Sequence, residues 1–230
     1  ADVRAVAEQL SAHGIESVAI AFLHSYANPT HEKAAAELLR SIIPGLYVTL
    51  SSEVSPEIRE YERASTSVTN AYVQPLMDSY LARMKSKLDT MGFRGALCLM
   101  TSGGGLTSVD TARKFPVRLV ESGPAGGAVF AAQVAARLGE RKVLAFDMGG
   151  TTAKVSIIDE YRSETSRVFE VDRAARFLKG SGLPVRIPVI EMVEIGAGGG
   201  SLARLDNLKR VTVGPESASS VPGPVCYNIG

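Results

Sequence analysis

A short polar stretch between two apolar runs holds the residues of this sequence best suited to chemistry. Asp147 precedes Met148, the pair Gly149-Gly150, and two hydroxyl side chains, Thr151 and Thr152. Glycines allow φ > 0 and bring bare N–H groups close to a ligand, and successive N–H groups form an anion-binding nest. The carboxylate suits a hydrated divalent cation. These residues predict a site for metal-bridged phosphate, although a tight turn stabilised by its own Asp and Thr side chains accounts for them equally well.

Two expected strands position this stretch. Residues 143–147 form an apolar run with β-branched and aromatic members, which indicates a buried strand. Residues 154–157 alternate between polar and apolar side chains, which is typical of a second strand. Strand, glycine turn and strand predict a β-hairpin that carries the polar residues at its tip.

Several glycine-rich motifs follow the same order as in a known family. They are the hairpin residues 146–151, residues 122–127 upstream, and residues 196–201, 213–215 and 222–227 downstream. The hairpin resembles the second phosphate loop of the superfamily of actin, the sugar kinases and the heat-shock chaperone ATPases. The whole series more closely resembles the ATP-binding subunit of the hydantoinase and oxoprolinase family, and the resemblance extends over essentially the whole chain.

The resemblance implies an α/β protein with the ribonuclease-H-like fold of actin and the sugar kinases, in which two lobes hold the nucleotide. Residues 1–93 are then the C-terminal part of the first lobe. Residues 94–230 are a second ribonuclease-H-like lobe with the phosphate-binding hairpin, truncated at its C-terminus. The family has an earlier Asp-x-Gly-Gly-Thr loop that does not occur before residue 147. We therefore expect a central fragment that lacks the N-terminal strands and does not hydrolyse ATP alone.

The family's chemistry implies the activity. ATP phosphorylates the ring carbonyl of a hydantoin, an N-methylhydantoin or 5-oxoproline, which prepares the ring for hydrolysis. The implied cofactors are ATP with Mg²⁺ or Mn²⁺, and the implied partners are a hydantoinase B-type second subunit and the cyclic amide. Two alternatives stay open, namely a subunit of an ATP-dependent acetone or acetophenone carboxylase, and an ATP-gated binding protein like the chaperone ATPases.

The resemblance also assigns residue roles. Asp147 and Glu121 are the expected catalytic residues, and Asp147 is also the expected metal ligand. Lys154 and Gly103 depart from the family, which more often has an acid and an asparagine at these positions. The expected nucleotide contacts are Gly149, Gly150, Thr151, Thr152, Gly198, Gly199, Gly200 and Ser201.

Composition narrows the class of function. The chain has 230 residues, of which 45% are hydrophobic, and a formal net charge of +1. This is enough for a core and gives no sign of a nucleic-acid or membrane partner. Without a signal peptide or an apolar run of about 18 residues, we expect a soluble, cytoplasmic protein. Cys98 and Cys226 form no CxxC pair and are expected to be buried free thiols, and the three histidines lack metal-ligand spacing.

The remaining patterns predict an open α/β sheet in the N-terminal half. A helix over residues 3–10 precedes a βαβ unit with strands at 17–23 and 46–50. A helical pattern then runs from Ser55 to Met91, and Pro75 is expected to kink or split it. The charged residues at its start, 59–63, either line a cleft or form a solvated face.

Further expected elements complete the chain. The loop Thr101–Gly105 after a strand at 95–100 is either a ligand-binding edge or a simple turn. A small-residue helix is expected after Ser122, which can cap it, with Pro124 in its first turn. The other expected strands cover residues 117–120, 165–171 and 184–195.

Overall fold

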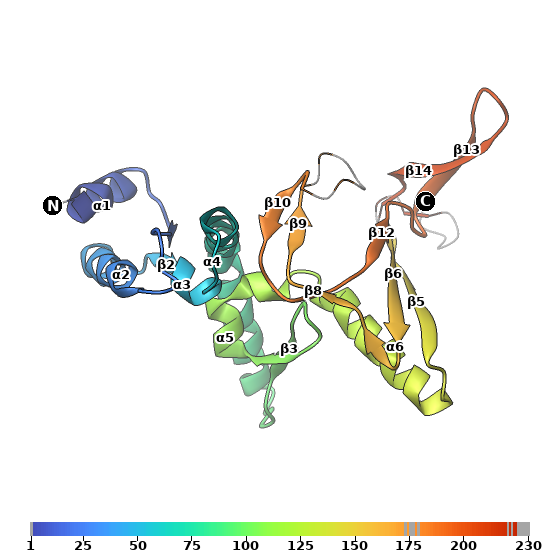
Figure 1. Ribbon diagram of the computed structural model, residues 1–230, viewed down its shortest axis with the longest axis horizontal. Helices are drawn as coiled ribbons and strands as arrows, with labels where there is room; N and C mark the ends of the chain where they lie inside the picture. Colours follow the sequence, from blue (N-terminus) through green and yellow to red (C-terminus); the bar gives the residue numbers. More distant parts are fainter. Residues whose placement is uncertain are drawn as a thin grey trace. The chain divides into compact units, whose positions relative to one another are not determined.

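The computed structural model describes residues 2–172, 174, 178, 180–219, 221 and 223–224 (Figure 1). The chain forms two compact units, Ala1–Ser122 with Ser166–Val189, and Gly123–Thr165 with Ile190–Gly230. This division differs from the expected boundary between residues 93 and 94, because residues beyond 93 bond to helix α4 (Glu60–Thr90). Asn70 accepts a hydrogen bond from the Val117 amide at 3.3 Å, and Thr66 accepts one from the Arg186 amide at 2.8 Å.

The first unit is built on a parallel pair of strands, which confirms the predicted βαβ unit. Strand β1 (Ser17–Ile20) pairs with β2 (Tyr47–Leu50), and Figure 1 shows α1 (Asp2–Ala12) and α2 (Thr30–Ile42) on one side of the pair and α4 on the other. The strand β1 ends at Ile20 and not at Leu23, because the chain turns over residues 23–27. The core on the α1 and α2 side consists of Ala7, Ile20, Ala35, Ala36, Leu39, Leu46, Val48 and Leu50.

The other face of the strand pair is polar and meets α4. Tyr47 donates a hydrogen bond to Asp78 at 2.9 Å, and Thr49 donates one to Gln74 at 3.1 Å. Ser17 donates to the carbonyl of Ala71 at 2.7 Å. Burying a polar group costs free energy unless the group is hydrogen-bonded. The side chains of α4 that face the strands must therefore supply hydrogen-bond partners as well as fill the space.

Helix α4 runs unbroken for 31 residues with Pro75 inside it, so of the two expected outcomes, a kink or a split, the split does not occur. Proline lacks an N–H group and leaves the carbonyl four residues earlier without its helical donor. That carbonyl belongs to Ala71, and the hydroxyl of Ser17 supplies the missing hydrogen bond. The predicted helix start at Ser55 is also wrong, because a short helix α3 (Ser51–Val54) is followed by a loop that ends at Arg59.

The rest of the first unit is a set of short elements. Residues 117–120 were expected to be extended, but they overlap the 3-10 helix η1 (Pro116–Leu119), where Val117 is fully buried against Val185 and Ile187. The other elements of this unit are β3 (Cys98–Met100), β4 (Leu106–Ser108), α5 (Val109–Lys114), β9 (Phe169–Val171) and β10 (Leu183–Val185). Strands β8 (Thr165–Ser166) and β11 (Val189–Ile190) each have one residue in either unit. The single strand expected at 165–171 is thus replaced by β8 and β9.

Cys98 is exposed, so its expected burial is wrong, and Cys226 lies outside the described residues. Within the described part of the chain, no helix combines the length and the apolar character that crossing a membrane requires.

The second unit contains the predicted helix and hairpin. The predicted small-residue helix is α6 (Ser122–Leu138), which includes the expected cap Ser122 as its first residue, and its Ala125 and Ala128 pack with Ile190. The sheet has the strand order β12-β6-β5, with β7 also on β6, and all these pairs are antiparallel. The strands of this unit are β5 (Lys142–Met148), β6 (Ala153–Asp159), β7 (Arg162–Ser163), β12 (Val193–Ile195), and the unexpected hairpin β13 (Ser201–Leu205) with β14 (Val211–Ser217).

Strand β5 was expected to be buried, and this is wrong for one of its faces. Leu144, Phe146 and Met148 are 65%, 58% and 53% exposed, whereas the alternating residues Val143 and Ala145 are partly buried. Successive side chains of a strand point to opposite faces, so an apolar run alone does not tell how many of those faces are covered.

Candidate functional site

The predicted hairpin places its polar residues at one tip, the turn Gly149–Thr152, which we call the hairpin turn. Met148 of β5 pairs with Ala153 of β6, so the hairpin turn connects the last residue pair of the two strands. The amide of Gly149 donates to the carbonyl of Thr152 at 2.9 Å and closes the turn. The amide of Gly149, which we expected at the phosphate, is therefore used within the turn.

The other donors of the hairpin turn have no partner within the described part of the chain. The amides of Gly150 and Thr151 donate no hydrogen bond there, and neither do the hydroxyls of Thr151 and Thr152. Thr151 is exposed and Thr152 is half-buried, so water reaches these groups. Buried backbone amides are nearly always paired, whereas exposed and grouped donors are available to an anionic ligand.

The conformation of the glycines differs from the expected one. Neither Gly149 nor Gly150 has a positive φ, so the hairpin turn does not require glycine for its backbone angles. A Cβ atom on Gly150 would meet no atom within 4 Å. The protein's own packing therefore leaves open space at Gly150, where a ligand can approach the backbone closely.

Asp147 lies one residue before the hairpin turn with an exposed side chain. Its Oδ2 lies 3.9 Å from the Cβ position of Gly127 on α6, so the glycine brings the helix close to this carboxylate. Asp147 is directly opposite Lys154 across the strand pair, and Lys154 lies opposite Glu194 on its other side. The ammonium of Lys154 is 3.8 Å from Glu194, with only 14% of the lysine side chain exposed. Lys154 is thus held between two acidic positions and not turned to solvent.

The donor set at the hairpin turn fits a magnesium ion that binds together with phosphate. Within the described residues, no group of three or more His, Cys, Asp or Glu side chains could hold a metal by itself. Mg²⁺ keeps several waters and commonly uses one or two carboxylates together with substrate phosphates. Asp147 supplies one exposed carboxylate, and the hydroxyls of Thr151 and Thr152 are further oxygen ligands close by in sequence.

The residues Gly198–Ser201, which we call the glycine loop, pack against the hairpin turn. The amide of Gly199 donates to the carbonyl of Gly149 at 2.9 Å, and the amide of Gly200 donates to the carbonyl of Gly150 at 2.8 Å. The amide of Gly198 donates to Ser201 Oγ at 2.8 Å, and the amide of Ser201 donates to the carbonyl of Gly198 at 3.0 Å. The structure thus brings the two predicted phosphate motifs together, but all four amides of the glycine loop are used inside the protein.

The remaining motif residues lie elsewhere. Glu121 belongs to the first unit, lies immediately before α6 in the sequence and has a positive φ of 63°. Its catalytic role stays a prediction. The loop Thr101–Gly105 is the turn of the antiparallel β3–β4 hairpin, which is the simple-turn alternative. Residues 213–215 belong to β14, and most of the 222–227 motif lies outside the described residues.

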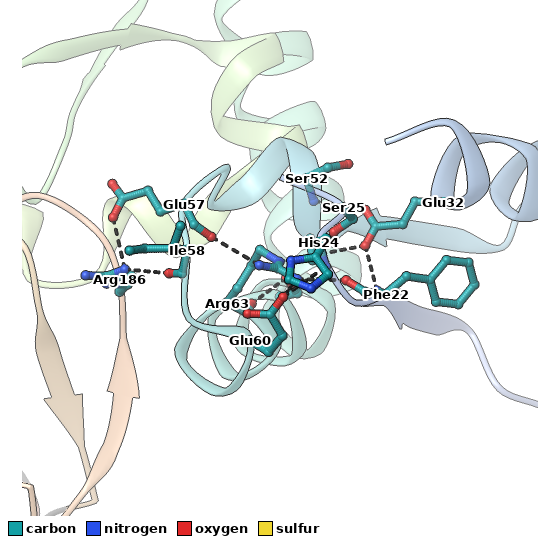
Figure 2. A network of polar contacts seen from close by, with 12 residues as sticks. Phe22, His24, Ser25, Glu32, Ser52, Glu57, Ile58, Glu60, Arg63 and Arg186 are labelled. Atoms are coloured by element: carbon teal, nitrogen blue, oxygen red, sulfur yellow. Dashed lines mark hydrogen bonds and ion pairs between the residues drawn. The ribbon is translucent and has the colours of Figure 1, made fainter. Parts of the chain in front are cut away.

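A second polar cluster, in the first unit, was not recognised in the sequence (Figure 2). Arg63 is 1% exposed, whereas the charged residues 59–63 were expected at a cleft or on a solvated face. Glu32, on α2, is fully buried. Arg63 donates to Ser51 Oγ at 3.1 Å and to the carbonyls of Phe22 at 2.7 Å and Glu57 at 3.1 Å. Figure 2 shows Arg63 in the middle, with Phe22 and Glu32 on one side and Glu57 and Ile58 on the other.

Glu32 is equally well partnered. Its carboxylate accepts hydrogen bonds from Ser51 Oγ at 2.5 Å and from the amides of Phe22 and Ser52, each at 2.9 Å. Burial raises the pKa of Glu32, but these hydrogen bonds outweigh burial and hold the pKa below its ordinary value. The network connects the chain segments that follow β1 and β2 to the first turn of α4.

The comparisons with known proteins confirm the predicted family. The family model described as "Hydantoinase/oxoprolinase" matches residues 63–230, and the model of its N-terminal region matches residues 1–43. An uncharacterized protein of Methanocaldococcus jannaschii is 43% identical over the whole chain and 34% of its own length. The caprolactamase subunit alpha of Pseudomonas jessenii is 35% identical over the whole chain and 32% of its length. The 5-oxoprolinase of Saccharomyces cerevisiae is 37% identical over 99% of the chain and 17% of its length.

Solved structures show a similar mixed α/β fold. The crystal structure of the ATP-dependent caprolactamase from Pseudomonas jessenii aligns with 99% of this chain and 32% of its own, with a TM-score of 0.79 and 34% identity. A nucleotide-free structure of an acetone carboxylase, from work on ATP-dependent acetone carboxylation, covers 94% of this chain and 30% of its own, with a TM-score of 0.75 and 26% identity. The chain spans about a third of the length of the first curated relatives that it matches.

Proposed function

The chain belongs to the hydantoinase/oxoprolinase family, and we propose that it is part of the ATP-binding subunit of an enzyme that hydrolyses a cyclic amide with ATP. The observation that carries the proposal is a group of hydrogen-bond donors at the hairpin turn that have no partner among the described residues, namely the amides of Gly150 and Thr151 and the two threonine hydroxyls. The relatives support it, because they include a caprolactamase subunit and a 5-oxoprolinase. The finer fold in this proposal is a ribonuclease-H-like pair of lobes around the nucleotide.

Phosphorylation explains why a ring amide would need ATP. The carbonyl oxygen of the ring attacks the γ-phosphorus, a new P–O bond forms, and the bond to the β-phosphate oxygen breaks and releases ADP. Water then adds to the ring carbon, the ring C–N bond breaks to leave an acyl phosphate, and a second water releases phosphate. Each step avoids expulsion of an amine from an unactivated amide.

The residues of the hairpin turn would serve the first of these steps. Phosphoryl transfer depends on positioning and on donors that are already in place for the charged oxygens. Gly150 N, Thr151 N and the hydroxyls of Thr151 and Thr152 would bind the phosphate oxygens. Asp147 would hold Mg²⁺ or Mn²⁺ through water, and the metal when bound would neutralise phosphate charge. The catalytic role of Glu121 belongs to the same proposal.

A second subunit and a cytoplasmic location complete the proposal. Two relatives are named as subunits, caprolactamase subunit alpha and acetophenone carboxylase gamma subunit. The partner proposed here is a hydantoinase B-type subunit, which would act on the activated ring. An excised piece that contains only the second phosphate loop is expected to fold but not to turn over ATP, since half of the phosphate contacts would be missing.

The main alternative is an ATP-dependent ketone carboxylase, which the likeness to the acetone carboxylase structure supports. The test is ADP formation by the intact protein with its partner subunit, measured with a panel of lactams and hydantoins and, separately, with acetone or acetophenone plus bicarbonate. Stimulation by a ring amide is the expected result. Stimulation only by a ketone with bicarbonate would favour the carboxylase, and stimulation only by unfolded peptide would favour a chaperone-like protein.

A further inference from the structure

The hydrogen bonds of the glycine loop act on the two peptide units that carry the partnerless amides. The loop holds the carbonyls of Gly149 and Gly150 through the amides of Gly199 and Gly200. The carbonyl of Gly149 and the amide of Gly150 belong to one planar trans peptide unit, in which C=O and N–H point in opposite directions. The same holds for the carbonyl of Gly150 and the amide of Thr151. Holding each carbonyl toward the loop therefore aims each amide away from it.

Steric requirements for glycine occur in the glycine loop and not in the hairpin turn. A Cβ atom on Gly198 would lie 2.7 Å from Gly149 O, Gly150 C and Thr151 N. A Cβ atom on Gly200 would lie 2.9 Å from Ser217 Oγ and 3.0 Å from Gly150 O. The atoms in the way at Gly198 are all backbone atoms, so a side chain there would push the loop off the hairpin turn.

The glycine loop is itself fixed from two sides. The hydroxyl of Ser201 accepts from the amide of Gly198 at 2.8 Å, which closes the loop on itself. The carbonyl of Gly200 accepts from the amide of Ala218 at 2.7 Å, just beyond β14. Gly200 is buried, so these bonds form with little access of water. A loop held in this way can resist rotation of the peptide units that it contacts.

We propose that Gly198, Gly199, Gly200 and Ser201 are positioning residues that aim the amides of Gly150 and Thr151 at the phosphates of ATP. This inference rests on the proposed function. It changes the expected role of these four residues, because their own amides are already used and they act on the nucleotide through the hairpin turn. A loosened loop would let the two peptide units rotate, and the amide donors would no longer point together at one anion.

The test compares Gly198→Ala with Gly196→Ala in the intact protein. A Cβ atom on Gly196 would meet no atom within 4 Å, so this neighbouring substitution is a matched control. The measurement is the Kd for Mg²⁺ with a non-hydrolysable ATP analogue, and in parallel the Kd for adenosine, which has no phosphate. Gly198→Ala should weaken analogue binding about ten- to a hundredfold, which corresponds to two misdirected hydrogen bonds, and leave adenosine binding unchanged. Gly196→Ala should match the wild type.

A purely structural role would give a different pattern, in which the fraction of active protein falls but the Kd for both ligands stays the same. Equal analogue affinity for Gly198→Ala and wild type, or an equal loss in both alanine variants, would overturn the inference and leave the proposed function intact. A wild-type protein that binds neither the analogue nor ATP would overturn the proposed function as well.

A second pair of variants decides the question if Gly198→Ala does not fold. Ser201→Ala removes the acceptor of the Gly198 amide, while Ser201→Thr keeps a hydroxyl at the same position. The alanine variant should weaken analogue binding about tenfold, and the threonine variant should restore it. Wild-type affinity in both variants would overturn the inference.

Discussion

The Arg63–Glu32 network of the first unit and the hairpin turn are both clusters of polar groups, and they differ in how their hydrogen-bond donors are used. In the network, Arg63 and Glu32 are buried and bond to one another's neighbours, to carbonyls and to amides. At the hairpin turn, the amides of Gly150 and Thr151 have no partner among the described residues, and a Cβ atom on Gly150 would meet none of their atoms within 4 Å. A polar cluster with satisfied partners holds a fold together, whereas one with partnerless exposed donors is suited to a ligand.

Arg63→Leu tests the structural side of this comparison and has the largest expected effect. It removes the hydrogen bonds that Arg63 donates to Ser51 Oγ, Phe22 O and Glu57 O, and it breaks the 3.2 Å ion pair of Arg63 with Glu60. We expect a loss of about 3–5 kcal/mol in the free energy of unfolding, measured by urea denaturation. Arg83→Leu, an exposed position on the same helix, is the control and should change the value by less than about 0.5 kcal/mol. Equal stability of both variants would contradict a structural role for the network.

Asp147→Asn tests the ligand side. The side chain is exposed, so stability should stay within about 0.5 kcal/mol of wild type. ATP turnover by the intact protein with its partner subunit should fall about a hundredfold or more, because a charge placed for the phosphates and their metal is lost. Steady-state kinetics and thermal unfolding measured on the same preparation separate the two effects. An unstable variant would give Asp147 a structural role, and a stable and fully active variant would give it no role at the ligand. Either result would contradict the distinction between the two clusters.

The hairpin turn could be predicted from the sequence, and the network could not. An apolar run before Gly149-Gly150 and alternating side chains after it predicted the two strands and the tip, because this information is local. Arg63 and Glu32 are 31 residues apart, and the parallel pairing of β1 and β2 is needed to bring α4 and α2, which carry them, close together. The buried face of α4 is itself polar, with Arg63, Ser67, Asn70 and Gln74 at helical spacing, so hydrophobic periodicity does not reveal it.

Tertiary contacts also decided where the predictions failed. Pro75 does not split α4, because Ser17 is close enough to bond the carbonyl that proline leaves unpaired. The steric need for glycine lies at Gly198, about 50 residues from the backbone atoms that impose it. Neither the Ser17 hydroxyl beside Pro75 nor the hairpin-turn backbone beside Gly198 could be identified from the local sequence.

The pH dependence of stability sharpens the account of the network. The folded-state pKa of Glu32 is lowered, so its charged form contributes stability above the unfolded value of about 4.3, and this contribution is lost as the pH falls through the lower folded value. Glu32→Gln should cost about 1–2 kcal/mol near pH 7, because a charged acceptor is replaced by a neutral one. The difference between wild type and variant should shrink as the pH is lowered below about 4 in urea titrations. A difference that is constant with pH would contradict the charged state assigned to Glu32.

Ser17→Ala has the smallest expected effect on stability. It tests, at a single carbonyl, whether a buried polar group needs its hydrogen-bond partner. It leaves Ala71 O inside α4 without a donor, which should cost about 1 kcal/mol of unfolding free energy. In a Pro75→Ala background the helix regains its own amide at this position, so the cost of Ser17→Ala should largely disappear. A double-mutant cycle with no coupling between the two positions would show that the hydroxyl does not compensate for the proline.

Hydrogen–deuterium exchange of the intact protein, with and without Mg²⁺ and a non-hydrolysable ATP analogue, tests the central distinction most directly. Gly150 and Thr151 are exposed, and their amides have no partner in the part of the chain that the structure describes, whereas the amides of Phe22 and Ser52 already donate to Glu32. We predict that the analogue slows exchange in peptides that contain residues 147–153 and leaves peptides from 22–32 and 51–63 unchanged. No slowing at the hairpin turn in protein saturated with the analogue, or slowing confined to the network peptides, would contradict the assignment of the hairpin turn to the phosphates.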